Sequence, residues 1–164
     1  MNMGRMQRTK GAKFERDVVR RINAIDGWTA VRGLQSRGGR SLPDVRARLA
    51  DIELHIECTH GRNPPIPAKW RQAMRDHREG ATPLVWARYH GGWEMVVMRW
   101  EDFAKFPVDS ITWVRHAACM KNAIEKAATT SWHPSMPLGV SEIDGEPMAG
   151  VLQADFVRIL GRIK

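Results

Sequence analysis

Two short runs of alternating polar and apolar residues constrain the fold of this 164-residue chain more than any other feature. The runs cover residues 43–49 and 53–59, and their alternation is the period of a strand with one buried face. Only Ala50-Asp51-Ile52 connects them, which is short enough for a hairpin. The apolar positions expected to face the core are Val45, Ala47 and Leu49 in the first run and Leu54, Ile56 and Cys58 in the second.

Pairing the two runs brings two acidic residues to the same side of one small sheet. Asp44 follows Pro43 at the start of the first run, and Glu57 lies with His55 and Thr59 on the polar face of the second. Two carboxylates on neighbouring strands suit a hard, oxygen-preferring cation such as Mg²⁺. On a strongly basic chain, this pair indicates a metal-dependent enzyme that acts on nucleic acid.

The distribution of charge supports a polyanionic partner. The net charge is +8, and residues 1–49 hold 12 of the 26 Lys and Arg but only 4 of the 18 Asp and Glu, so the whole excess lies there. A polyanion bound to this part would release counterions at each phosphate contact. The alternative is a solvated basic face that serves only solubility.

The cysteines and the hydropathy argue against several other classes of protein. Cys58 and Cys119 lie far apart and no CxxC pair exists, so neither a disulfide framework nor a zinc site is expected. No apolar run has the length of a membrane span, and the N-terminus lacks the apolar core of a signal peptide. These features favour a cytoplasmic protein without a membrane partner. No small-molecule cofactor is expected either.

The remaining patterns predict a mixed α/β core over residues 10–106, preceded by a mobile basic arm at residues 1–9. Its expected order is α-β-β-β-α-β-β. The expected elements are a helix at 10–25, a strand at 28–32, the hairpin, a helix at 68–79, and strands at 83–89 and 93–98.

Residues 107–164 are expected to form a mainly helical extension. One helix begins at Asp109 or Ser110 and runs to about residue 128, and residues 129–147 are rich in Pro, Gly and Ser, as in a linker. Residues 151–163 have the apolar spacing of an amphipathic helix, for which packing on the core and dimerisation are both open.

With its elements in this order, the chain resembles the PD-(D/E)xK nuclease superfamily, in particular its Holliday-junction resolvase-like branch, which includes many phage proteins. The resemblance covers roughly residues 10–103. It rests on Lys10-Gly11-Ala12-Lys13-Phe14-Glu15-Arg16, Ser36, Pro43-Asp44, Ile56-Glu57-Cys58-Thr59, Trp70-Arg71-Gln72-Ala73 and Trp100-Glu101-Asp102-Phe103. It implies a restriction-endonuclease-like core with a central mixed sheet flanked by helices.

The resemblance also implies roles for the acids. Asp44 and Glu57 would bind Mg²⁺, for which Mn²⁺ is a possible substitute, and Glu15 would be a third carboxylate that reaches the metal directly or through water. Such a metal lowers the pKa of bound water and neutralises charge on the phosphate. The structural alternatives are a turn residue for Asp44, a solvated strand position for Glu57 and a surface ion pair for Glu15.

The chain departs from the family at the motif lysine, where it has Thr59. A hydroxyl group brings no charge and is a poor base at neutral pH. Lys69, with Gln72 on the same polar helix face, is the preferred replacement as a catalytic residue, and its alternative is a solvated lysine. His60 is adjacent, but strand alternation directs it to the other side.

The basic residues suggest where DNA is held. The Gly38-Gly39 loop allows close approach to phosphate, although its arginines are equally consistent with solvated loop charges. The candidate DNA-binding residues are Lys10, Lys13, Arg32, Ser36, Arg37 and Arg40.

The sequence therefore predicts a Mg²⁺-dependent endodeoxyribonuclease that cleaves branched DNA, acts in DNA recombination and forms a homodimer. Its location would be the cytoplasm, that of the host if the chain is phage-encoded. The second hypothesis is a catalytically impaired DNA-binding module with the same fold, and the third is a basic protein–protein adaptor. Metal-dependent nicking separates the first hypothesis from the second, and salt-sensitive DNA binding separates both from the third.

Overall fold

The computed structural model describes residues 3–33, 42–106 and 138–163. The chain divides into two compact units, residues 1–94 and residues 95–164. The division falls inside a strand, whereas the sequence suggested a boundary near residue 106. The helix expected at about 109–128, and the first part of the expected linker, lie outside the described residues.

The first unit contains both helices and the strands predicted from the sequence, and the mixed α/β class is confirmed. The order of its four complete strands in the sheet is β1-β2-β3-β4. The elements are α1 (Met3–Asn23), β1 (Thr29–Arg32), β2 (Val45–Leu49), β3 (Ile52–Gly61), α2 (Ile66–Asp76) and β4 (Ala81–Tyr89), and the unit ends at the first residue of β5 (Glu94–Arg99).

Helix α1 is longer than the sequence predicted. It begins at Met3 instead of Lys10. Residues 3–9 are therefore helical, and the expectation of a mobile arm there is wrong. These residues contain Met, Arg and Gln, which favour helix, and no proline interrupts them. As expected from their spacing, Phe14, Val18 and Ile22 are the buried face of α1.

The predicted hairpin is present as β2 and β3. Leu49 pairs with Ile52 in the antiparallel ladder, so Ala50 and Asp51 alone form the turn. Ala50 has a φ of 49°, in the left-handed region that short hairpin turns require.

The polar face of β3 was expected to point outward, and this expectation is wrong. His55, Glu57 and Thr59 are 3%, 0% and 7% exposed. The reason is that β3 lies between β2 and β4 and that α2 covers this face. A strand covered on both faces buries its polar residues as well as its apolar ones.

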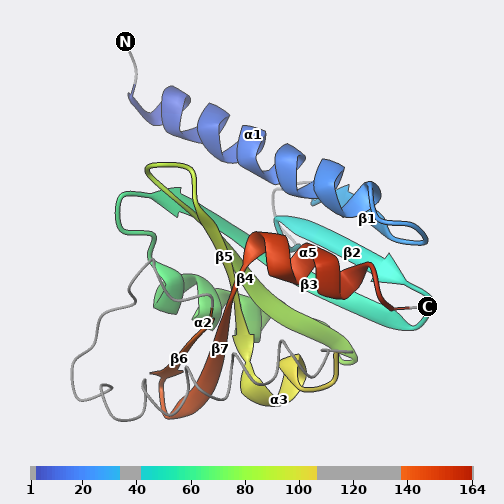
Figure 1. Cartoon of the computed structure of the whole chain (residues 1–164). Coiled ribbons are helices and arrows are strands. Elements are labelled where there is room, and N and C mark those ends of the chain that lie inside the picture. The colour runs from blue at the N-terminus through green and yellow to red at the C-terminus, as the bar shows by residue number, and fades with distance from the viewer. Residues whose placement is uncertain (1–2, 34–41, 107–137, 164) are drawn as a thin grey trace. The chain divides into compact units, whose positions relative to one another are not determined.

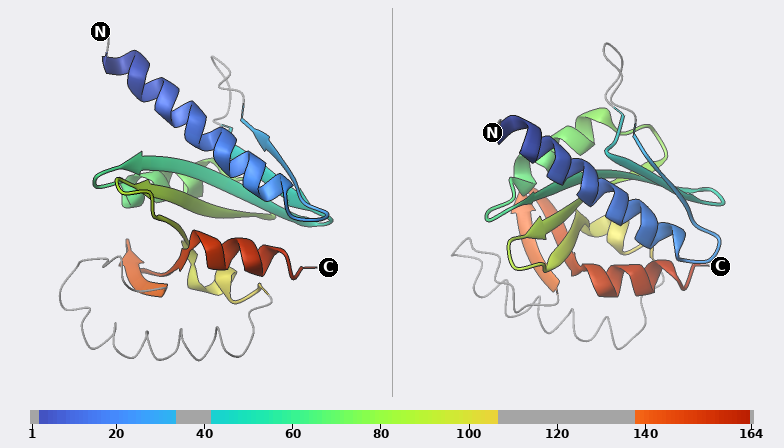
Figure 2. Two further views of the ribbon diagram at one scale, coloured as in Figure 1. Left: turned by 45° about the horizontal axis from the view of Figure 1, so that its top comes forward. Right: turned by 90° about the horizontal axis from the view of Figure 1, so that it is seen from above.

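Helices α1 and α2 cover opposite faces of this sheet. The ring of Phe14 in α1 packs against His60, whereas Lys69 in α2 contacts Glu57, and residues 57 and 60 point to opposite faces of β3. Figure 2 shows the two helices on either side of the strands. Strands β3 and β4 are parallel, so α2 is the crossover connection that a parallel pair requires (Figure 1).

The second unit contains a small antiparallel sheet in the order β5-β7-β6. Its further elements are α3 (Trp100–Phe103), β6 (Leu138–Ile143), β7 (Glu146–Leu152) and α5 (Gln153–Leu160). Residues 138–147 therefore form most of a hairpin and not a linker. The turn at Asp144-Gly145 has positive φ at both residues, which is a hairpin turn signal inside a stretch that otherwise resembles loop.

The C-terminal amphipathic helix is present but shorter than expected. Val151 and Leu152 complete β7, and α5 begins only at Gln153. Phe156, Ile159 and Leu160 are buried, and Phe156 packs edge-on against Phe106. No helix in the described part of the chain is both long and apolar enough to cross a bilayer.

Candidate active site

Asp44 and Glu57 meet where strand β2 begins. Val45 pairs with Ile56, so the preceding residue, Asp44, lies beside the Glu57-Cys58 segment of β3. The backbone N–H of Cys58 donates a hydrogen bond of 2.9 Å to Asp44 Oδ2. The backbone of β3 thus orients the carboxylate of Asp44, the residue that precedes β2.

Lys69 is the third member of this site. Its Nζ donates to Glu57 Oε2 at 2.8 Å and to Asp44 Oδ2 at 3.1 Å. Lys69 lies in the first turn of α2, whose entry is fixed by Pro65 at the N-cap and a proline within the first two helical positions. Three elements, β2, β3 and α2, therefore bring two carboxylates and one ammonium group together.

The ammonium group of Lys69 remains charged in this setting. Partial burial alone would lower the pKa of Lys69, but the nearby carboxylates of Asp44 and Glu57 outweigh that effect and raise it. A lysine with a raised pKa does not accept a proton at neutral pH. Its chemical contribution is a fixed positive charge at the edge of the site.

Cys58 is a neutral thiol and not a nucleophile. Burial raises its pKa well above the ordinary value, and the charges of Asp44, Glu15 and Glu57 raise it further, against an opposing effect of Lys69. Glu15 thus acts electrostatically on the Cys58 thiol together with Asp44 and Glu57.

The side chain of Glu15 does not join the pair formed by Asp44 and Glu57. Its carboxylate forms an ion pair with Arg32, which lies at the end of β1. Within the described ranges, no group of three or more His, Cys, Asp or Glu side chains is close enough to hold a metal ion. The structure thus brings together two of the three predicted acids.

The chemistry of the pair fits a hard divalent cation. Oxygens of Asp44 and Glu57 converge on one positively charged group, the ammonium group of Lys69. Mg²⁺ is commonly held by one or two carboxylates and otherwise by water. Two converging carboxylates are therefore sufficient donors from the protein for such an ion.

The other residues predicted near the site occupy different positions. Thr59 is buried two residues beyond Glu57 on the same strand face, at roughly 6–7 Å along the strand. Gln72 is half-buried and lies three residues after Lys69, on the same side of α2. His60 packs against Phe14 of α1, and burial together with Lys10, Arg88 and His90 lowers its pKa.

Only some of the candidate DNA-binding residues lie in the described ranges. Lys10 and Lys13 are exposed on α1, and Arg32 is exposed in β1 while paired with Glu15. Ser36, Arg37 and Arg40 lie outside the described residues.

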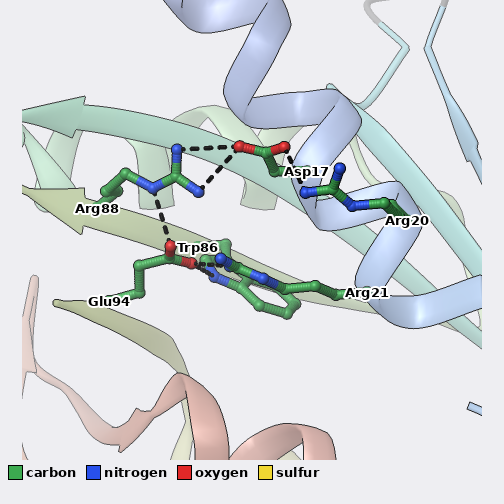
Figure 3. A network of polar contacts seen from close by, with 6 residues as sticks. All are labelled: Asp17, Arg20, Arg21, Trp86, Arg88 and Glu94. Carbon is green, nitrogen blue, oxygen red and sulfur yellow. Dashed lines mark hydrogen bonds and ion pairs between the residues drawn. The ribbon is translucent and has the colours of Figure 1, made fainter. Parts of the chain in front are cut away.

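Sequence reasoning missed a buried polar network on the α1 face of the sheet. Glu94, whose side chain is 4% exposed, accepts hydrogen bonds from Trp86 Nε1 at 2.9 Å, from Arg88 Nε at 2.8 Å and from Arg21 (Figure 3). Arg88 also donates to Asp17 at 3.3 Å. Removing one partner from such a buried network typically costs about 3–5 kcal/mol, because the remaining charges lose their compensation.

This network fixes α1 on the sheet near Glu15. Asp17 and Arg21 come from α1, while the guanidinium of Arg88 also stacks at 4.2 Å over the ring of Phe14, the residue before Glu15. The available sequence signal was the pair of polar residues, Arg88 and Glu94, on the two sides of the expected turn at residues 90–92.

A mixed α/β core that places one acid at the start of a strand and a second in the middle of its neighbour is typical of PD-(D/E)xK nucleases, and here the lysine beside them comes from α2. The family model described as archaeal Holliday junction resolvase (Hjc) matches residues 6–126. The chain therefore belongs to the Hjc family, within the PD-(D/E)xK nuclease superfamily. A comparison with curated proteins gives no significant match.

Proposed function

We propose that this chain is a metal-dependent endonuclease that cleaves phosphodiester bonds in branched DNA. The observation that carries the proposal is the convergence of Asp44 and Glu57 on the Lys69 ammonium group. Membership of the Hjc family supports a nuclease of the Holliday-junction resolving kind. The thiol of Cys58 is free, and a cytoplasmic location, where thiols stay reduced, is part of the proposal.

Each residue of the site has a separate task in this proposal. Asp44 and Glu57 hold the divalent cation, Mg²⁺ or Mn²⁺, and Asp44 is kept in orientation by the Cys58 N–H. When bound, the cation supplies a Lewis acid that lowers the pKa of water and neutralises phosphate charge. Lys69 remains an ammonium group and stabilises the negative charge that develops on the scissile phosphate.

Glu15 and Gln72 have supporting roles. Glu15, which is paired with Arg32, acts from α1 and adds negative charge near the cation site through water and not as a direct ligand. The amide of Gln72, one turn after Lys69, is a neutral hydrogen-bonding group for the attacking water or the substrate backbone.

A four-way junction is the substrate that best fits a resolvase family. Resolution requires two cuts related by the two-fold symmetry of the junction, which a symmetric dimer makes with two identical sites. We therefore propose a homodimer that acts in DNA recombination.

The proposal is tested by incubating the full chain with a four-way junction and with linear duplex of the same sequence, in Mg²⁺, Mn²⁺ or EDTA. We expect symmetric paired nicks in the junction with either metal, little cleavage of the linear duplex, and none in EDTA. Salt-sensitive DNA binding without cleavage in any metal would identify a binding module instead of a nuclease.

The outer face of α1 (Lys13, Arg16 and Arg20) is the proposed contact with the DNA backbone. These three side chains are exposed and lie opposite the buried face of the helix. Their spacing of three and four residues aligns them along the helix. A row of cations on one helix face suits the phosphates of one duplex arm.

Charge reversal on this face is expected to weaken binding to DNA of any base sequence, because phosphate contacts do not depend on the bases. Lys13→Glu and Arg16→Glu should each reduce the slope of log binding constant against log salt by about 1, because each removes a phosphate contact. The slope is measured by fluorescence anisotropy over a salt series. Arg158→Glu, which changes an exposed arginine of α5, is the matched control and should leave the slope unchanged. An unchanged slope in Lys13→Glu and Arg16→Glu would locate the DNA elsewhere.

A further inference from the structure

Two buried polar atoms next to the candidate active site have no hydrogen-bond partner. Over the part of the chain that the structure describes, they are His55 Nε2 and Glu57 Oε1. The two atoms lie 3.4 Å apart. The side chains are 4% and 0% exposed, so bulk water does not reach them.

The position of His55 follows from the strand. His55 and Glu57 are two residues apart in β3 and share the face that α2 covers. The His55 ring meets the ring of His77 edge-on, with centroids 6.5 Å apart. His77 Nδ1 lies 2.8 Å from the carbonyl oxygen of Met74, to which it donates. The neighbouring histidine is thus engaged with the helix backbone, while Nε2 of His55 lies near the Glu57 carboxylate.

A buried carboxylate with one unpaired oxygen is costly. Leaving a buried polar group without a partner costs about 1–3 kcal/mol, and more when the group is charged. Glu57 Oε2 already receives a hydrogen bond from Lys69. A donor at Oε1 would satisfy the second oxygen and would fix the plane of the carboxylate, and His55 Nε2 lies 3.4 Å from that oxygen.

We propose that His55 is a positioning residue for Glu57. Its ring carries a proton on Nε2 and donates a hydrogen bond from there to Glu57 Oε1, which keeps Oε2 turned toward Lys69 and the cation. The part that concerns the cation rests on the proposed function, whereas the hydrogen bond itself does not. Groups that orient metal-binding side chains in this way typically change metal affinity about 10- to 100-fold when they are removed.

Direct titration of the full chain with Mn²⁺ by calorimetry, without DNA, tests the effect on the cation. We expect His55→Met to weaken Mn²⁺ binding at least about 10-fold. His55→Gln, whose amide nitrogen reaches the position of Nε2, should restore most of that loss. His77→Met, which changes the neighbouring ring but not the group facing Glu57, is the matched control and should bind Mn²⁺ like the wild type.

Two results would overturn the effect on the cation: wild-type affinity in folded His55→Met, or an equal loss in His55→Gln and His55→Met. The second result would indicate a loss of packing and not of a hydrogen bond. Circular dichroism establishes that each variant is folded.

The protonation of the ring is measured in the unmodified protein, so it does not depend on whether a variant folds. Long-range ¹H–¹⁵N spectra of the histidine-labelled chain distinguish the two neutral tautomers. We expect His55 as the Nε2–H tautomer, and a Nδ1–H tautomer would overturn the proposal. If the wild type binds no Mn²⁺, the cation of the proposed function is refuted, while the tautomer still decides whether His55 donates to Glu57.

Discussion

Replacing Asp44 by asparagine or Glu57 by glutamine is expected to reduce metal-dependent DNA cleavage at least about 1,000-fold. Each change removes one of the two carboxylates proposed to hold the cation, and a metal ion contributes several kcal/mol of transition-state stabilisation. Because each 1.36 kcal/mol of lost stabilisation lowers the rate tenfold, a loss of several kcal/mol corresponds to about three tenfold decreases in the cleavage rate. Cleavage of a labelled junction under single-turnover conditions measures the effect.

The chain offers a matched control for each change. Asp51→Asn alters an exposed acid in the hairpin turn, and Glu53→Gln alters an acid four residues before Glu57 on the same strand face. Both control variants should cleave like the wild type, and DNA binding should survive in all four. Full cleavage by Asp44→Asn or Glu57→Gln would remove that residue from the site.

Replacing Lys69 by alanine is expected to lower the cleavage rate about 100- to 1,000-fold, the usual effect of removing one group that stabilises transition-state charge. The change also leaves Glu57 buried without its cation, so the variant should be less stable without metal. Divalent metal should therefore raise its melting temperature more than that of the wild type. Arg75→Ala, which removes an exposed charge from the same helix, is the control for both measurements.

A second substitution distinguishes a moved lysine from a merely stabilising one. Thr59 lies on the same strand face as Glu57, so a lysine at this position extends toward the same site. Thr59→Lys in the Lys69→Ala background should recover part of the lost cleavage rate. If Lys69→Ala keeps robust activity while remaining folded, the assignment of the motif lysine to α2 is wrong, and Thr59 and His60 become the residues to test.

Much of the first unit could be predicted because its signals are local. The two-residue alternation defined β2 and β3, and the apolar spacing of Phe14, Val18 and Ile22 defined α1. The burial of His55 and Glu57 could not be predicted in this way, because it depends on α2 covering the face that the alternation marks as polar. The hairpin at 138–152 was missed since its turn residues resemble those of a loop.

The candidate site likewise has one part that local sequence patterns predict and another part that depends on packing between distant elements. The proximity of Asp44 and Glu57 follows from strand pairing, which the alternation of polar and apolar residues in the two runs predicts. The contact of Lys69 with both carboxylates depends on how α2 packs, and only its polar helix face suggested it beforehand. The pairing of Glu15 with Arg32, and the network around Glu94, involve residues far apart in the chain and left no signal strong enough to be used.

Because the lysine beside the two acids lies on the crossover helix α2, distant nucleases with this arrangement are harder to recognise from their sequences. The separation of Glu57 and Lys69 is set by a strand-to-helix connection, and not by the two-residue period of one strand. Connections of this kind gain and lose residues readily during evolution, whereas a strand does not. A genome search that demands a lysine at one fixed spacing from the acid passes over such a chain. Searching the first turn of the following helix for a lysine would recover it.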